Sequence, residues 1–315
     1  MMGTESPPAR LRGPPADRGP AERLAFGVVN LDKPPGPSSH QVSAWIRDAV
    51  DDAMTTAGRD PIDRAAHAGT LDPKVTGCLP IMLGDATRLA QAFLDGQKEY
   101  VAVLECHGPV PDDIEAIAAE FVGPIYQKPP RKSAVVRRLR TRTIHDLEIL
   151  ETTDRRALVR IRCESGTYVR KLCHDLGLAL GTGAHMGDLR RTGTAPFDDT
   201  TLVSAHDLLD ALAFWLEDDD PEPLIEVVEP AERILEELPA VTIAESAARE
   251  VATGAPVYAP GVLAVDETTH ELVDDASEPL VACYTPNGAA VCLGNLVGDP
   301  DATSGTVVDL ERVLI

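Results

Sequence analysis

Apolar positions along the chain alternate or cluster in a way that predicts strands mixed with helices. The apolar runs at residues 26–31 and 78–84 are typical of buried strands. Residues 98–108 and 157–165 alternate between apolar and polar, which predicts strands with one buried face. In 157–165 the alternation is strict, because its odd-numbered positions begin with Ala, Val, Ile and Cys.

Helical spacing lies between these strands. Ser38 or Ser39 is a suitable N-cap for a first helix. The apolar face of that helix would hold Val42, Trp45, Ile46, Ala49 and Val50. A polar loop is expected at 51–66 and an irregular basic stretch at 126–142. Further helices are predicted at 85–93, 111–121, 204–217 and 246–253, with one more directly after the GTY of residues 166–168.

Composition divides the chain into unequal parts. Residues 1–23 are rich in Pro, Gly and Arg and are predicted to form a flexible tail. Acidic residues and prolines crowd between the two larger parts, so we place a linker at 226–238, after a large domain at 24–225. Short strands and Gly-rich turns in residues 239–315 predict a small β-barrel with one helix.

Length and cysteine usage argue against several classes of protein. A chain of 315 residues with 43% hydrophobic residues is long enough for two cores. It contains no run of about 18 apolar residues, and its N-terminus lacks the apolar segment of a secretory signal. The six cysteines include no CxxC pair, which argues against a structural zinc site and fits reduced thiols in the cytoplasm.

Charge is distributed unevenly along the chain. The formal net charge is −22, yet residues 128–191 carry 15 Lys/Arg against 7 Asp/Glu, whereas 192–315 carry 3 against 26. A basic segment in an acidic chain favours contact with a polyanion, although a solvated basic face has the same composition. The acidic surface and the excess of Arg over Lys resemble proteins of salt-loving organisms. Because high salt weakens phosphate contacts, any RNA binding must also use shape, stacking and base contacts.

Asp72 occupies a short loop, HAGTLDPKVTG at residues 67–77, directly before an apolar strand. Asp-Pro and glycine are turn residues, so this stretch taken alone is consistent with an ordinary turn. The alternative is a nucleophilic carboxylate held on a rigid loop. Other motifs in the chain favour the second interpretation.

Motifs of one family occur here in the family's order. TruB-type RNA pseudouridine synthases have segments similar to GVVNLDKPPGPSSHQV, HAGTLDPKVTGCLPIMLGDATRL, KEYVAVLECHG and ESGTYVRKLCHDLG. The segment YQKPPRKSAVVRRLRTRTI resembles the archaeal and eukaryotic dyskerin-type branch, which is the catalytic subunit of box H/ACA ribonucleoproteins. The C-terminal segment looks like a PUA domain. The resemblance covers about residues 24–315. It implies an α/β (α+β) fold with a mixed, largely antiparallel sheet and a catalytic cleft, followed by a β-barrel. It also implies isomerisation of uridine to pseudouridine without a cofactor or metal.

The resemblance assigns the chemistry to three residues. Asp72 matches the catalytic aspartate, the nucleophile toward a uridine that has left its stack. Arg170, in GTYVRK, matches the arginine that pairs with this aspartate and holds its carboxylate in place. Tyr100, in KEY, matches the tyrosine that stacks on the uracil and is a candidate for removing its C5 proton.

Five further residues match positions that support or bind the substrate. These are Lys33, His67, Tyr168, Leu189 and Arg190. Lys33 and His67 are expected to support the loop and place the nucleotide, and Leu189 to pack against the base. Arg191 would steady the site or the backbone, or would lie solvated on an edge strand.

Two substrates stay open within the family. One is the T-loop uridine (position 55) of tRNA, modified without a guide. The other is ribosomal RNA selected by an H/ACA guide RNA, together with small archaeal ribonucleoprotein partner proteins. No membrane partner is expected. In residues 239–315 only Arg249 and Arg312 are basic, so it stays open whether this part binds RNA.

Two other classes of function compete with this interpretation. A non-catalytic RNA-binding scaffold predicts the loss of Asp72, Tyr100 or Arg170, and all three are present. An RNA methyltransferase would need a Gly-rich cofactor loop after the first strand, where this chain has DKPPG. Proline removes the backbone donors that such a loop uses, so this alternative is discounted.

Overall fold

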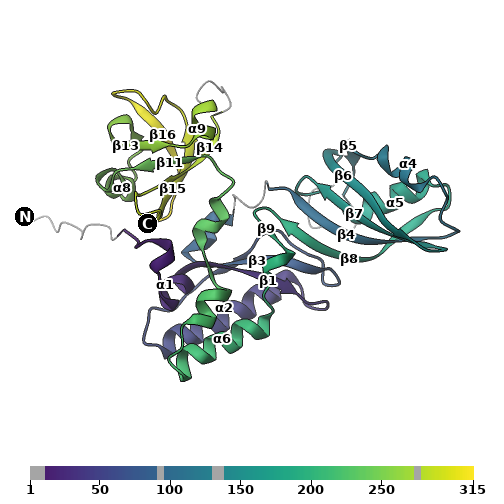
Figure 1. Ribbon diagram of the computed structural model, residues 1–315, viewed down its shortest axis with the longest axis horizontal. Coiled ribbons are helices and arrows are strands. Elements are labelled where there is room, and N and C mark those ends of the chain that lie inside the picture. The colour runs from purple at the N-terminus through teal and green to yellow at the C-terminus, as the bar shows by residue number, and fades with distance from the viewer. Residues whose placement is uncertain (1–10, 91–95, 130–137, 273–277) are drawn as a thin grey trace, which may run out of the picture.

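Two β-sheets organise the protein (Figure 1). A computed structural model describes residues 11–90, 96–129, 138–272 and 278–315. The first sheet is long and is flanked by helices, whereas the second forms a compact unit built from the C-terminal residues. The predicted mixture of helices and strands is therefore confirmed.

The first sheet has ten strands, and eight of them form one hydrogen-bonded series. Their order is β10 (Glu229–Pro230), β1 (Phe26–Lys33), β3 (Thr76–Gly84), β8 (Ala184–Thr194), β4 (Lys98–Cys106), β7 (Arg156–Cys163), β6 (Arg140–Thr152) and β5 (Gly123–Gln127). Off this series, β2 (Ala65–His67) pairs with β3, and β9 (Phe197–Asp198) pairs with β8. Only the pair of β3 with β8 is parallel among these strands, so the predicted largely antiparallel sheet is confirmed.

Helices pack on this sheet in two groups, and each group closes a separate hydrophobic core. The first group is α1 (Pro20–Ala25), α2 (Ser39–Thr56), α6 (Ala205–Glu217) and α7 (Glu222–Val227). The second is α4 (Ile114–Ala119) and α5 (Val169–Ala179). Tyr100 on β4 and Leu189 on β8 pack against both cores, so the middle of the sheet is the seam between them.

Helix α2 of the first group shows why its residues form a helix there. Ser38 is the N-cap of α2: its hydroxyl accepts the Gln41 N–H, and the Gln41 side chain accepts the Ser38 N–H. On the predicted apolar face Val42, Ile46 and Val50 are buried and Ala49 is partly buried, whereas Trp45 is 58% exposed. The helix also continues to Thr56 where a polar loop was expected, because Ala53 and Met54 extend the buried face by one more turn.

Other predicted elements differ at their ends. The strand at 157–165 is confirmed as β7, with its apolar positions buried. The helix predicted at 85–93 begins as a 3-10 turn, η2 (Asp85–Leu89); Ala90 is α-helical, and residues 91–95 lie outside the described residues. The stretch at 126–142 is not irregular at its ends, because β5 and β6 reach into it. Its middle, 130–137, lies outside the described residues.

The second sheet follows the acidic segment and has its own core. Its order is β12 (Val257–Tyr258), β16 (Thr306–Val313), β15 (Ala290–Leu296), β14 (Leu280–Tyr284), β11 (Ala240–Ile243) and β13 (Val262–Val265). The predicted helix is confirmed as α8 (Glu245–Ala252), and a further helix, α9 (Glu267–Glu271), follows β13. Short 3-10 turns complete the described elements: η1 (Pro15–Asp17), η3 (Asp199–Thr201), η4 (Ala231–Leu235) and η5 (Ala259–Gly261).

Residues 11–23 contain η1 and most of α1, so the flexible tail predicted at 1–23 does not describe these residues. Arg18 is 3% exposed and makes a two-point ion pair with Glu232, at 2.7 and 2.8 Å. The Arg12 guanidinium lies over the Phe26 ring at 3.9 Å. Both arginines contact residues outside the N-terminal segment, and such contacts cannot be predicted from a local composition rich in Pro and Gly.

The segment predicted as an acidic linker, 226–238, is also part of the packed structure. Its strand β10 pairs with β1, and η4 contributes buried Ile234 and Leu235 to a third core. That core includes residues of both sheets, such as Val28 and Leu293. Glu232 also accepts the backbone N–H of Ala290 at 3.0 Å, so one buried carboxylate joins the N-terminal segment to the second sheet.

We expect Glu232→Gln to lower the free energy of unfolding by about 3–5 kcal/mol, because it leaves the Arg18 cation buried without a counter-ion. Urea unfolding followed by circular dichroism measures this change. Arg47→Met removes an exposed pair with Asp48 and should cost less than about 0.5 kcal/mol. Equal losses in the two variants would contradict the role assigned to the buried pair.

Candidate active site

Asp72 lies in the loop between β2 and β3, and this loop is a true turn. The Val75 N–H donates to the Asp72 carbonyl at 2.9 Å. Gly69 and Gly77 flank the turn with φ values of +79° and +94°, where glycine is favoured. A Cβ at Gly77 would lie 2.2 Å from the carbonyl oxygen of Arg191, so this position also requires close backbone approach.

Lys33 supports the loop from beneath. Its side chain is 0% exposed, and its ammonium donates to the carbonyls of Pro34, Pro73 and Val75 at 2.9, 3.1 and 2.9 Å. Burial lowers the pKa of Lys33. These contacts agree with the expected support of the loop by Lys33, whereas its part in placing the nucleotide stays a prediction.

Arg191 holds the two ends of the same loop. Its side chain is 1% exposed; Nε donates to the Cys78 carbonyl at 2.6 Å and Nη2 to those of Ala68 and Gly69, both at 3.2 Å. The alternative of a solvated arginine on an edge strand is wrong, because β8 lies between β3 and β4. The guanidinium instead occupies the space under the loop.

Ser39 provides a third contact to the loop. Its hydroxyl accepts the Leu71 N–H at 2.8 Å and donates to the Leu71 carbonyl at 3.0 Å. Ser38 caps α2, so the neighbouring serine is free to bind the residue directly before Asp72. Lys33, Ser39 and Arg191 together hold the loop through its backbone and leave the Asp72 carboxylate outside.

Arg170 brings a cation to this carboxylate from the other half of the sheet. It lies in the first turn of α5, and its Nη2 donates to Asp72 Oδ2. The two side chains are 51% and 55% exposed. A half-exposed pair contributes only about 0–1 kcal/mol to stability. Its main effect is therefore to set the direction of the carboxylate.

Tyr100 and Leu189 line the seam next to this pair. Tyr100 is the cross-strand neighbour of Arg191 in the β4·β8 register, and Leu189 is that of Ala102. Burial raises the pKa of the Tyr100 phenol, and the nearby Arg191 guanidinium opposes the rise. Both side chains are only partly buried, so each presents apolar surface where the two cores meet.

His67 and Arg190 have partners of their own within the protein. His67 meets the His40 ring edge-on, with centroids 4.8 Å apart, and neither of its ring nitrogens has a hydrogen-bond partner among the described residues. Burial, followed by His40, lowers the pKa of His67. Arg190 makes a two-point ion pair with Asp32, at 3.0 and 3.0 Å, rather than with Asp72.

Tyr168 precedes α5 and is its N-cap residue. The side chain of Gln127 binds the backbone of Tyr168, and no local pattern assigns Gln127 an individual role. Ser39 and Asp32 were likewise not singled out as site residues. Ser39 stood only as an alternative N-cap, and the partners of Asp32 and Gln127 lie far away along the chain.

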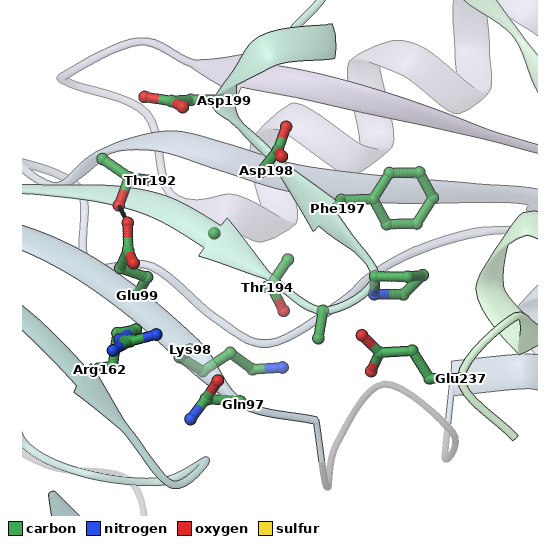
Figure 2. A pocket seen from close by; sticks show the side chains of 13 residues that line it. Gln97, Lys98, Glu99, Arg162, Thr192, Thr194, Phe197, Asp198, Asp199 and Glu237 are labelled. Carbon is green, nitrogen blue, oxygen red and sulfur yellow. Dashed lines mark hydrogen bonds between the residues drawn. The ribbon is translucent and has the colours of Figure 1, made fainter. Parts of the chain in front are cut away.

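A cavity of about 390 Å³ lies beside the start of β4 and the end of β8 (Figure 2). Its charged lining residues are Lys98, Glu99, Arg162, Asp198, Asp199 and Glu237. None of these is a predicted site residue, and Glu99 is bound by the Thr192 hydroxyl at 2.9 Å. We place the candidate centre at Asp72 instead, because a half-exposed carboxylate with a cation is open to a macromolecular substrate.

The described ranges contain neither a cluster of metal-ligating side chains nor a membrane-spanning helix. No group of three or more His, Cys, Asp or Glu side chains there is arranged to hold a metal ion. No helix in the same ranges is long and apolar enough to cross a membrane.

Comparison with protein families gives three matches along the chain. The N-terminal domain of TruB family pseudouridylate synthases matches residues 59–110 and 106–169. The C-terminal domain of tRNA pseudouridylate synthase B matches residues 170–236, and the DKCLD (NUC011) domain matches 8–43. The boundary between the TruB N-terminal and C-terminal matches falls between Val169 and Arg170, in the first turn of α5.

Whole-chain relatives agree with these matches. A probable tRNA pseudouridine synthase B of Halobacterium salinarum is 61% identical over 312 residues, 97% of this chain and 99% of the relative. A chain in the crystal structure of a Cbf5–Nop10–Gar1 complex superposes with a TM-score of 0.86 and 42% identity, covering 100% of this chain and 92% of that one. A chain in an H/ACA RNP bound to a substrate RNA containing 2′-deoxyuridine gives a TM-score of 0.85, 40% identity and coverages of 100% and 92%.

The lowered pKa of His67 predicts how stability changes with pH. Below about pH 6.5 the unfolded chain binds a proton at this histidine that the folded chain does not, so stability falls as the pH falls. We expect His67→Phe to unfold within about 1.5 kcal/mol of the wild type at pH 8. Between pH 6.5 and 5 the free energy of unfolding should fall less steeply in the variant than in the wild type. The two slopes should differ by up to about 1.4 kcal/mol per pH unit. Urea unfolding across this range measures both slopes, and parallel slopes would contradict the prediction.

Proposed function

This chain belongs to the TruB family of pseudouridylate synthases, and from that premise we propose that Asp72 is the nucleophile with which it converts uridine to pseudouridine in RNA. The observation that carries the proposal is the pair of Arg170 with Asp72 across the seam of the sheet. Backbone contacts hold the loop, and the carboxylate stays open to a substrate.

The chemistry requires few groups. Pseudouridine formation breaks the N1–C1′ bond and forms a C5–C1′ bond, while the C5 proton leaves and N1 gains one. Atoms and electrons balance within the nucleoside, so no oxidant or reductant takes part. Asp72 supplies the nucleophilic carboxylate, and Arg170 keeps it oriented. Tyr100 stacks on the uracil at the seam and is the candidate for taking the C5 proton.

The remaining pocket residues bind the flipped nucleotide. Leu189 offers apolar surface against the base, and Tyr168 lies at the start of α5 beside Arg170. Arg190 is partly exposed, and pairing with Asp32 engages only two of its five N–H groups, which leaves donors for the RNA. His67 supports the loop from the side of His40.

The basic segment is less available to RNA than its composition indicates. Several of its arginines lie on β6 and β7 and are paired with carboxylates of the protein itself. These pairs are Arg142–Glu164, Arg160–Glu148 and Arg162–Asp146. RNA binding therefore relies on shape and stacking as well as on phosphate contacts, as suits an acidic protein whose relative comes from Halobacterium salinarum.

Two substrates are supported by different relatives. The halobacterial relative is named a probable tRNA pseudouridine synthase, which supports the T-loop uridine of tRNA. The similarity of the whole chain to chains in the Cbf5–Nop10–Gar1 complex and in the H/ACA RNP supports ribosomal RNA selected by a guide RNA, with small proteins such as Nop10 and Gar1 as partners. We place the enzyme in the cytoplasm, since all six cysteines are unpaired.

The proposed domains correspond to the two sheets. Residues 24–225 form the catalytic domain, 226–238 connect it to the C-terminal part, and 239–315 form a PUA domain. Because Arg249 and Arg312 are the only basic residues of that last part, any contact it makes with RNA uses backbone amides and shape.

Tritium release from uridine labelled at C5 tests the proposal. We expect the wild-type protein in high potassium chloride to release tritium from a tRNA transcript, from ribosomal RNA supplied with guide RNA and partner proteins, or from both. Release from the tRNA alone would establish a stand-alone enzyme, and release only with the guide would establish a ribonucleoprotein enzyme. A transcript with cytidine at the target position is the control. No release from either RNA would favour the non-catalytic scaffold.

A further inference from the structure

Gln127, the last residue of β5, binds Tyr168, the N-cap residue of α5. Its side-chain oxygen accepts the Tyr168 N–H at 2.9 Å, and its side-chain nitrogen donates to the Tyr168 carbonyl at 3.2 Å. A carboxamide presents the same donor and acceptor as a peptide group. The Gln127 side chain can therefore bind both backbone groups of Tyr168, as a neighbouring strand would. The side chain is 1% exposed, so water cannot easily replace these bonds.

The carbonyl that Gln127 binds is the one that starts the helix. It also accepts the N–H groups of Lys171 and Leu172, at 2.9 and 3.0 Å. These bonds form the first turn of α5, and Arg170 lies within that turn. A shift of Tyr168 would therefore move the base of the Arg170 side chain.

A second set of contacts holds the other end of this segment. Glu164 accepts from Arg142 Nη1 at 3.1 Å and from the Thr143 N–H at 3.0 Å, both on β6. Gly166 follows with a φ of +76°, and a Cβ there would lie 3.3 Å from the Arg142 guanidinium. The segment is thus anchored at both ends by the β5–β6 pair, and Gln127 is the anchor nearer to Arg170.

We infer that Gln127 is a positioning residue for Arg170: its carboxamide fixes the start of α5 so that the guanidinium meets the Asp72 carboxylate. The inference rests on the proposed function of the Asp72–Arg170 pair and extends it to a residue that is buried away from the reacting atoms.

Gln127→Met removes both hydrogen bonds while keeping the length of the side chain. We expect kcat for tritium release to fall about 10- to 100-fold, because small displacements of a catalytic group have effects of this size. KM for the RNA should change less than about threefold, since Gln127 does not bind the substrate. Ile144→Val, in the same strand pair, is the control; it should destabilise the fold but keep kcat within about twofold.

A double-mutant cycle separates positioning from general damage. In an Arg170→Lys background the arginine to be positioned is gone, so adding Gln127→Met should change kcat less than about threefold. Losses that multiply across the two substitutions would overturn the inference.

A measurement without substrate keeps the inference independent of the RNA chosen. In protein labelled with ¹⁵N-arginine, the Arg170 side-chain signal is identified by its absence in Arg170→Lys. We expect this signal to shift in Gln127→Met and to stay in place in Ile144→Val. An unchanged signal in Gln127→Met would overturn the inference. A shifted signal in a protein that is inactive on every RNA would support it and count against the proposed function alone.

Discussion

The position of Asp72 depends on two buried cations that bind its loop through the backbone. Lys33 and Arg191 donate to carbonyl oxygens on either side of the aspartate, and both side chains are essentially unexposed. Burying a cation is costly unless its donors are satisfied, so each cation requires the loop in this conformation. The loop in turn needs the cations, because its turned-in carbonyls would otherwise lack partners. A rigid support results, from which the carboxylate projects outward.

The site is also a product of the seam between two hydrophobic cores. Asp72 comes from the half of the sheet covered by α2 and α6, and Arg170 comes from the half covered by α5. Tyr100 and Leu189 pack against both cores and lie where the two cores meet. Pairing across such a seam orients a carboxylate without enclosing it, as a reaction on a base within a large RNA requires.

Local sequence patterns predicted most helices and strands. The predictions failed where a residue depends on contacts with residues far away along the chain. Strict alternation predicted β7, and the order of the motifs predicted the loop, the tyrosine strand and the arginine helix. The N-terminal segment looked disordered because the partner of Arg18 lies 214 residues away. The burial of Lys33 could not be predicted from the sequence, since only the folded loop supplies the three carbonyls that its ammonium binds. Gln127 carried no local signal, because its bonds reach the backbone of a residue 41 positions away.

The most direct measurement is single-turnover tritium release by Asp72→Asn beside the wild type, on whichever RNA the wild type modifies. The substitution keeps the size of the side chain and removes only its charge and nucleophilic oxygen. We expect the variant to bind the RNA, to unfold at a similar urea concentration and to release no tritium above the blank. Release at a substantial fraction of the wild-type rate would show that the carboxylate of Asp72 is not the nucleophile.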